Sequence, residues 1–394
     1  MEDMVRDWLQ RDTFRGRRVL VTGHTGFKGS WLAIWLARLR AKVSGYALPP
    51  PTTPSNFVVS NVRRLLENNV TADIRDGACL DEAFEQIDPE IVFHLAAQPL
   101  VRASYALPHE TFEINMLGTA AVLDAVRRRN KPCVVVVVTS DKCYENREQV
   151  WGYRETDPLG GHDPYSASKA AAEILVASYR RSFFSPERLH QHHVKLATVR
   201  AGNVIGGGDW AGDRIVPDAV RHLVAGVPIP VRNPRAVRPW QHVLESLSGY
   251  LTLAAKMCES DDPRWCEAWN FGPASGEELS VARLVEQFLA AWGDGAWTDV
   301  SAADQPHETA MLRLNIDKSR YQLGWRPRWT PCQAVERTAG WYRRYYESPH
   351  CRMLEACEED IEAFESADDA RIGSPPLSTQ LSAVNVPYST AVLQ

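Results

Sequence analysis

The chain has 394 residues, enough for one large α/β unit with a smaller satellite. Its formal net charge of −5 gives no sign of a nucleic-acid-binding surface, and no apolar run is long enough to cross a bilayer. The eight cysteines are scattered without a CxxC pair, which argues against a metal or redox site and suits a reducing cytosol. We therefore expect a cytoplasmic globular protein without metal, membrane or nucleic-acid partners.

Strand and helix signals alternate along the first half of the chain. Residues 1–17 are a polar lead-in, with a short helix predicted around 5–9. Apolar runs then predict strands at 18–22, 43–48, 70–74, 91–96, 133–138 and 196–204, and helical periodicity follows the first strand and recurs at 111–128 and 164–181. This alternation is typical of right-handed βαβ units. We predict an α/β fold in which residues 18–204 form a Rossmann-type parallel sheet flanked by helices, an NAD-binding domain.

The pattern changes after residue 204. Three consecutive glycines, 206–208, are followed by frequent Pro, Trp and Arg, so we expect residues 205–350 to form mainly a smaller mixed α/β lobe that binds substrate. A strand near 268–272 is expected to rejoin the main sheet, and Ser280 is a candidate N-cap for a helix at 280–292. Residues 351–394 are acidic and then rich in Ser, Thr and Pro, which predicts a disordered tail.

Three glycines lie between the first strand and its helix. Gly23 would permit a tight turn, Gly26 would let the backbone approach a pyrophosphate, and Gly29 would allow close contact between helix and strand. The free N–H groups of the helix N-terminus favour phosphate binding there. Glycine spacing alone is a weak signal, but the strand–loop–helix context favours a dinucleotide site over a plain turn.

The choice between NAD and NADP depends on the end of the second strand. The sequence Gly45-Tyr-Ala-Leu48 has no carboxylate for a ribose, and no Arg follows directly for a 2′-phosphate, so we favour NAD. Asp73 and Ile74 follow the third strand and could contact adenine or be an ordinary loop. The small residues at Leu95-Ala96-Ala97 would let the cofactor pass closely.

A second group of polar side chains follows the buried run 133–138. Ser140 comes directly after this predicted strand, and Tyr165 and Lys169 are one helical turn apart. A free Tyr has a pKa of about 10, but an ammonium and a nicotinamide cation nearby would stabilise the phenolate. An exposed Tyr and Lys on an amphipathic helix are the alternative. The candidate cofactor-binding residues are Gly23, Thr25, Gly26, Phe27, Lys28, Gly29, Asp73, Ile74, Leu95, Ala96, Ala97, Tyr165 and Lys169.

These motifs resemble those of the extended short-chain dehydrogenase/reductases. Within that group, the stretches 22–29, 139–144, 200–210 and 238–243 are most similar to CDP-glucose 4,6-dehydratases, and the likeness covers roughly residues 15–345. The resemblance implies conversion of CDP-D-glucose to CDP-4-keto-6-deoxy-D-glucose and water, with hydride lent to bound NAD at C4 and returned at C6. It also implies deoxysugar and lipopolysaccharide O-antigen biosynthesis. It further implies a homodimer, or a dimer of dimers, paired through helices 111–128 and 164–181.

Asp141 and Lys142 favour a dehydratase over a plain reductase or epimerase, because elimination needs an acid and a base near C5 and C6. The resemblance implies that Asp141 is the acid. Related dehydratases carry a Glu base where Lys142 stands, so Lys142 is either the base or a group that stabilises an enolate. An exposed loop pair is the structural alternative. The candidate catalytic residues are Ser140, Asp141, Lys142, Tyr165 and Lys169.

Four residues are candidates for binding substrate. Arg238, Asn203 and His307 could contact the nucleotide or its phosphates. Arg238 is the strongest of these candidates, because a guanidinium suits a bidentate phosphate contact. Asn115 could order water near the Tyr165 hydroxyl, or be a polar helix position. The alternative functions are a dehydratase acting on another nucleotide sugar, an epimerase, or a dinucleotide sensor that would not need Tyr165.

Overall fold

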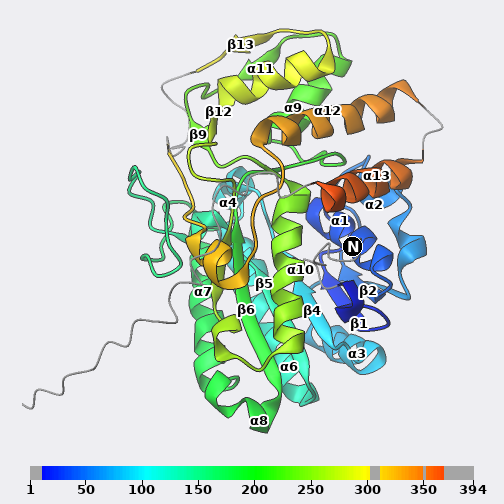
Figure 1. Ribbon diagram of the computed structural model, residues 1–394, viewed down its shortest axis with the longest axis vertical. Helices are drawn as coiled ribbons and strands as arrows, with labels where there is room; N and C mark the ends of the chain where they lie inside the picture. Colours follow the sequence, from blue (N-terminus) through cyan, green and yellow to red (C-terminus); the bar gives the residue numbers. More distant parts are fainter. Residues whose placement is uncertain (1–10, 302–310, 349–351, 368–394) are drawn as a thin grey trace, which may run out of the picture.

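The computed structural model describes residues 11–301, 311–348 and 352–367 and is built on one large parallel sheet (Figure 1). The sheet order is β11-β6-β5-β4-β1-β2-β3, and every pairing is parallel. This order confirms the predicted Rossmann-type sheet, including the late strand that rejoins it. The strands are β1 (Arg18–Thr22), β2 (Lys42–Ala47), β3 (Asn68–Thr71), β4 (Ile91–His94), β5 (Cys133–Val138), β6 (Val194–Ala201) and β11 (Ala268–Phe271).

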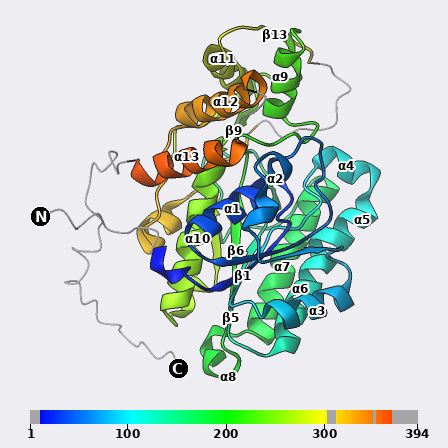
Figure 2. The ribbon, with the colours of Figure 1, turned by 90° about the vertical axis from the view of Figure 1, so that its right-hand side faces the viewer.

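Helices cover both faces of this sheet, as Figures 1 and 2 show. On one face lie α3 (Gly77–Ile87), α6 (Gly118–Arg129) and α7 (Pro164–Ser182), and on the other lie α1 (Phe27–Arg38) and α10 (Val243–Glu259). All six residues of β5 are buried, as expected when both faces of a strand are covered. The direction of the sheet order reverses at β1 and β4, and in such folds ligands bind beyond the carboxyl ends of the strands at this point.

The start of α7 is set by its own sequence. The Asp163 side chain accepts a hydrogen bond from the Ser166 backbone N–H at 2.9 Å, and Pro164 occupies the first helical position, where no N–H is required. This N-cap places Tyr165 in the first turn of the helix. The predicted helix at 111–128 is instead α5 (Pro108–Phe112), a π-helical turn (Glu113–Leu117) and α6 in succession.

The second lobe packs above the carboxyl ends of the strands (Figure 1). It contains α9 (Ile215–Val224), α11 (Val281–Trp292) and α12 (Pro331–Glu347), and Ser280 caps α11 as predicted, accepting from the Arg283 N–H at 3.2 Å. The expected lobe at 205–350 is interrupted, because α10 leaves it and packs on the main sheet. The short pairs are β7 (Val204–Ile205) with β10 (Gln241–His242), β8 (Ile229–Val231) with β13 (Trp297–Asp299), and β9 (Val237–Arg238) with β12 (Leu279–Ser280).

Three further helices of the structure have only four to six residues each. The short helices are α2 (Asn56–Val59), α4 (Val101–Ala106) and α8 (Leu189–His192). Within the described ranges, no helix combines the length and the apolar character that crossing a membrane requires.

The acidic segment near the C-terminus differs from the sequence prediction. We expected it to belong to a disordered tail, but it forms α13 (Met353–Ser366), which packs against α1. The helix is amphipathic, so its apolar side chains are buried while Glu359 faces outward and pairs with Arg344 at 2.6 Å. Asp360 and the Glu365 side chain are the buried acidic groups of this helix. The Phe364 ring lies 5.7 Å from Trp35 and 5.0 Å from Trp329. Residues 368–394 and the predicted helix at 5–9 lie outside the described residues.

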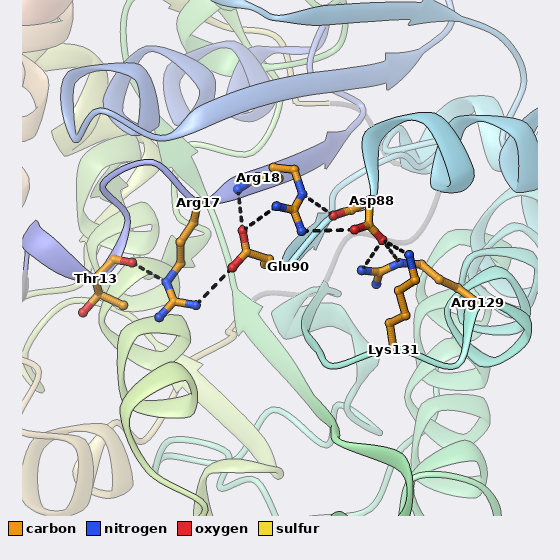
Figure 3. Close-up of polar contacts among 7 residues, drawn as sticks. All are labelled: Thr13, Arg17, Arg18, Asp88, Glu90, Arg129 and Lys131. Carbon is orange, nitrogen blue, oxygen red and sulfur yellow. Dashed lines mark hydrogen bonds and ion pairs between the residues drawn. The ribbon is translucent and has the colours of Figure 1, made fainter.

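A network of ion pairs lies at the amino ends of the central strands, opposite the second lobe (Figure 3). Asp88 follows α3 and accepts hydrogen bonds from Arg129 and Lys131, both at 2.9 Å. The Arg18 guanidinium bridges Asp88 and Glu90, at 3.2 Å and 3.5 Å. The hydrogen bond from Lys131 is the main reason why the pKa of Asp88 falls to about 2. These acidic and basic side chains are paired with one another, so we assign this network a structural role.

Replacing the Phe364 side chain tests whether α13 belongs to the folded core. Phe364→Ala should lower the free energy of unfolding by about 3–5 kcal/mol, the usual cost of removing a buried aromatic ring. Chemical denaturation measures it. Glu362→Ala on the exposed face of the same helix should cost under about 1 kcal/mol. Equal effects of the two substitutions would mean that α13 does not pack as described.

Candidate active site

A cavity of about 1290 Å³ lies where the carboxyl ends of the central strands face the second lobe. Its walls are the loops that follow β1, β4 and β5, the first turns of α7, and lobe residues between 201 and 238. The structure brings nearly all the predicted site residues together here: Gly23, Thr25, Gly26, Phe27, Lys28, Gly29, Asp73, Ile74, Leu95, Ala96, Ala97, Ser140, Asp141, Lys142, Tyr165, Lys169, Asn203 and Arg238.

The glycine loop makes different use of its three glycines. Gly23 has φ +73°, and a Cβ there would lie 2.7 Å from the Ala96 backbone nitrogen. A Cβ on Gly29 would lie 2.2 Å from the Gly23 carbonyl oxygen, so the helix needs glycine to pack on the loop. Gly26 is open by comparison, with its nearest contact at 3.4 Å, and no side chain caps the N-terminus of α1. The backbone N–H groups of this turn can therefore receive an anion.

A buried chain of hydrogen bonds joins the ends of β1 and β4 beneath this loop. The Thr22 hydroxyl accepts from the Leu95 and Ala96 N–H groups and lies 2.7 Å from His94 Nδ1. The other ring nitrogen of His94 lies 3.0 Å from the Thr119 hydroxyl. Burial lowers the pKa of His94 to about 3, so the ring is neutral at ordinary pH. The chain fixes the spacing between the two strand ends that form the floor of the cavity.

The far end of the cavity, beyond β2 and β3, is held by side-chain contacts with the backbone. The Thr25 hydroxyl donates to the Leu48 carbonyl at 2.9 Å, and the Tyr46 hydroxyl donates to the Asp73 carbonyl at 2.9 Å. Both carboxylate oxygens of Asp73 accept from the Arg75 guanidinium, at 3.0 and 2.7 Å. The Asp73 carboxylate, for which we left open a contact with adenine or an ordinary loop role, is thus already held by Arg75, although Asp73 lines the cavity.

Ser140, Tyr165 and Lys169 face the middle of the cavity. Burial raises the pKa of Tyr165 to about 12, and its hydrogen bond to Ser140 opposes that rise. Burial also lowers the pKa of Lys169 to about 8, while the nearby Glu173 carboxylate opposes that fall. The Lys169 ammonium donates to the Val138 carbonyl at 3.4 Å, at the end of β5. The three side chains therefore form one buried group that can accept or supply a proton.

Asp141 is the most constrained side chain of the site. It is 2% exposed, and its Oδ1 accepts from the Ser140 hydroxyl at 3.0 Å. Its Oδ2 is buried and has no hydrogen-bond partner among the described residues. A Cβ on Gly202 would lie only 1.7 Å from that oxygen, so glycine is required there. Burial raises the pKa of Asp141, while the Lys142 cation opposes the rise. A carboxyl group with a raised pKa can act as an acid near neutral pH.

The cavity is rich in cations. Burial lowers the pKa of Lys28 to about 7, and the nearby Arg214 guanidinium contributes to the fall. Arg214 donates to the Asp209 carboxylate at 2.7 Å and lines the same cavity. Arg214 and Gly202 are not among the residues predicted from the sequence, because only the three-dimensional fold brings the loop at 202–214 to the end of β5.

Two of the four predicted substrate-binding residues line the cavity. Asn203 has φ +44°, and its Oδ1 has no partner among the described residues. Arg238 also lines the wall, whereas His307 lies outside the described residues. Asn115 corrects the prediction: its amide donates to Ser168 at 2.8 Å and to the Gln98 carbonyl at 3.1 Å, and it does not line the cavity. Its hydrogen-bonding groups are used in joining the π-helical turn to α7.

The parallel sheet and the Ser–Tyr–Lys group at the carboxyl end of β5 define a short-chain dehydrogenase/reductase fold. The chain belongs to the GDP-mannose 4,6-dehydratase family, whose model matches residues 20–338. A CDP-glucose 4,6-dehydratase from Salmonella typhimurium is 45% identical over 91% of this chain and 99% of that protein. A dTDP-glucose 4,6-dehydratase from Streptomyces antibioticus is 31% identical over 82% of this chain and 92% of that protein.

Solved structures agree on the fold. The dTDP-glucose 4,6-dehydratase DesIV from Streptomyces venezuelae, solved with NAD bound, aligns with a TM-score of 0.71 at 24% identity. The alignment covers 84% of this chain and 99% of that one. A UDP-glucose 4-epimerase from Thermotoga maritima has a TM-score of 0.69 at 21% identity and covers 83% of this chain and 99% of that one. At this identity the likeness shows the fold alone, so the reaction has to be argued from the site.

The raised pKa of Asp141 predicts a pH-dependent cost to stability. When the folded pKa of a carboxyl group exceeds its unfolded value, the folded state is penalised as pH rises through the interval between the two values. Asp141→Asn removes this penalty and should therefore raise the melting temperature at pH 8 by more than at pH 5. Thermal unfolding at both pH values measures the difference. An equal shift at both pH values, or destabilisation at pH 8, would contradict the assignment of Asp141 as a buried carboxyl group with a raised pKa.

Proposed function

We propose that this protein converts CDP-D-glucose to CDP-4-keto-6-deoxy-D-glucose and water. The observation that carries the proposal is that the Asp141–Lys142 pair shares one cavity with Ser140, Tyr165 and Lys169. The Ser–Tyr–Lys group, which suits oxidation of an alcohol, thus lies in the same cavity as an additional acid and an additional cation, which suit elimination of water. The relative that is 45% identical supports a cytidine nucleotide and glucose as the parts of the substrate.

NAD fits the glycine-loop side of the cavity. Gly26 leaves room at the uncapped N-terminus of α1 for a pyrophosphate, while Gly23 and Gly29 make the close packing that shapes this turn. The cavity wall at Tyr46 and Ala47 carries neither a cation for a 2′-phosphate nor a carboxylate, which supports NAD over NADP. When bound, NAD would accept hydride from C4 of the sugar and return it to C6.

In the first half of the reaction, Tyr165 removes the proton of the sugar C4 hydroxyl. Burial raises the pKa of this phenol to about 12 despite its hydrogen bond to Ser140, and this pKa is too high for a base at neutral pH. The Ser140 hydroxyl and the Lys169 ammonium stabilise the phenolate, and the positive charge of the oxidised nicotinamide would stabilise it further. Ser140 contacts the same C4 oxygen of the sugar, so this oxygen stays in place while it loses its proton and becomes a carbonyl.

The second half of the reaction is the loss of water across C5 and C6. The new 4-ketone acidifies the C5 hydrogen, and the C6 hydroxyl leaves as water once it is protonated. Asp141 is suited to donate that proton, because burial raises its pKa. Lys142, the next residue, serves the C5 side, either as the base or as the cation that stabilises the enolate.

Three wider features belong to this proposal. The product is a keto-deoxysugar nucleotide, which suits deoxysugar and O-antigen biosynthesis. A cytoplasmic location is supported by the cysteines that the structure describes, all of which are free thiols. A homodimer paired through the helical segment 111–128 and α7 is supported by apolar side chains left exposed there, among them Leu117 at 53% and Ile174 at 60%.

The reaction is tested by incubating the purified protein with CDP-, dTDP-, UDP- and GDP-glucose and with GDP-mannose. CDP-glucose alone should give the alkali-induced absorbance of a 4-keto-6-deoxy sugar, with one water lost by mass spectrometry. A preference for dTDP-glucose would overturn the nucleotide assignment but leave the chemistry intact. Recovery of an epimerised sugar without loss of water would reject the dehydratase.

Tyr165→Phe is the matched variant for this assay. It removes one oxygen and keeps the ring, so turnover should fall at least about 100-fold, the usual scale for a lost acid–base group. Binding of CDP-glucose, measured by calorimetry, should change little. Unchanged turnover would show that Tyr165 is not the base.

The dimer is tested separately by light scattering. Ile174→Glu places a charge in the proposed helix interface and should convert a dimeric protein to a monomer. Val58→Glu, an equally exposed apolar position at 62% on α2, should leave the dimer intact. A monomeric wild-type protein, or a dimer that tolerates Ile174→Glu, would reject this interface.

A further inference from the structure

A buried ion pair lies directly behind the turn that carries Asp141 and Lys142. Glu173, one helical turn after Lys169 on α7, meets Arg200 of β6, and their side chains are only 2% and 4% exposed. Arg200 Nε and Nη2 donate to the two carboxylate oxygens of Glu173, both at 2.9 Å. This bidentate pair has a fixed geometry, because a guanidinium matches a carboxylate in shape.

The pair contacts both ends of the turn. At one end, the Thr139 hydroxyl donates to Glu173 at 2.5 Å, just after β5. At the other end, Arg200 Nη1 donates to the Tyr144 hydroxyl at 2.8 Å. Thr139 and Tyr144 flank Ser140, Asp141, Lys142 and Cys143, so one rigid pair holds both ends of the catalytic segment.

Further contacts tie Tyr144 to the rest of the sheet. Its hydroxyl donates to the Asn270 side chain of β11 at 2.7 Å, and the Arg200 guanidinium stacks 4.9 Å from its ring. Asn270 in turn donates to the Tyr153 carbonyl at 2.9 Å. The Tyr144 end of the turn is thus fixed by groups from β6 and β11.

We propose that Thr139, Tyr144, Glu173 and Arg200 are positioning residues that set where Asp141 and Lys142 stand relative to C5 and C6 of the sugar. The inference rests on the proposed function and adds a prediction about steps. The Tyr165 phenol bonds Ser140 at the start of the turn, but it is carried by α7, where the Tyr165 backbone N–H donates to the Ser104 hydroxyl at 3.1 Å, outside the turn. Loosening the turn at Tyr144 therefore slows the elimination more than the oxidation at C4.

Variants at the two ends of the turn test this inference, because loss of Glu173 or Arg200 would leave the other charge buried and threaten folding. Tyr144→Phe removes the hydroxyl that Arg200 holds and keeps the ring. The matched control is Tyr153→Phe, whose ring stacks 5.3 Å from Tyr144 but whose hydroxyl bonds Asn146 and the Arg147 N–H, away from the turn. Thr139→Val and Thr139→Ser form the second pair.

The readout separates the two halves of the reaction. Single-turnover absorbance of the reduced nicotinamide follows C4 oxidation, and product formation follows elimination. Tyr144→Phe and Thr139→Val should lower kcat by roughly 10- to 100-fold at nearly unchanged KM, since a misplacement of about 1 Å can cost that much. Reduced cofactor should accumulate in both. Thr139→Ser, which restores the hydroxyl, and Tyr153→Phe should stay within about 3-fold of wild type.

Three outcomes overturn the inference. The first is equal slowing of oxidation and elimination, the second is full activity in Tyr144→Phe and Thr139→Val, and the third is a loss in Tyr153→Phe as large as that in Tyr144→Phe. Wild-type protein assayed in parallel separates this result from the proposed function. If wild type dehydrates CDP-glucose and the variants do not behave as stated, only the positioning role fails. If wild type dehydrates none of the nucleotide sugars, both proposals fail.

Discussion

The buried pair of Glu173 and Arg200 is the interaction on which the catalytic half of the molecule depends. Removing two charges from water is costly, and their attraction offsets that cost only when the remaining hydrogen-bonding groups are also satisfied. Here the Thr139 and Thr198 hydroxyls donate to the two oxygens of Glu173 that Arg200 also contacts. Burial and these contacts together join α7, β5 and β6 at the depth where the site begins. The pair therefore determines where the end of β5 lies.

The two sides of the cavity are built by different means. The cofactor side is shaped by the backbone, since Gly23 and Gly29 pack so closely that no side chain fits. The opposite side is shaped by charged side chains held without full compensation. Lys28 lies on the cofactor side, but burial and the Arg214 and Lys169 cations facing it lower its pKa to about 7. On the opposite side, Asp141 has a carboxylate oxygen without a hydrogen-bond partner among the described residues. An anionic ligand entering this cavity would be attracted by the cations and would stabilise their charged forms.

The features that depend on neighbouring residues could be predicted from the sequence, whereas side-chain contacts between distant segments could not. The glycine loop, the N-cap at Ser280 and the one-turn spacing of Tyr165 and Lys169 depend on neighbouring residues, so they could be identified from the pattern alone. The clash that requires Gly202 beside Asp141 involves two residues that are 61 positions apart in the sequence, and nothing near either residue indicates it. Asn115 was assigned to the substrate because a polar residue on a helix does not reveal its partners. The acidic composition near the C-terminus concealed the apolar face of α13 for a similar reason.

Ser140 contacts the side chains proposed for both the oxidation and the elimination, so the two steps can take place in one site. Its hydroxyl donates to Asp141 at 3.0 Å and accepts from the Lys142 N–H at 3.2 Å, and the Tyr165 phenol bonds the same side chain. The proposed base of the first step and the proposed acid of the second are thus connected through the Ser140 oxygen. Because Ser140 is also the N-cap of the turn Asp141–Cys143, the turn begins at the residue that Tyr165 contacts and continues to the Asp141–Lys142 pair. Tyr144, Glu173 and Arg200 hold this turn from behind and do not line the cavity, so the space in front of the turn remains free for the substrate.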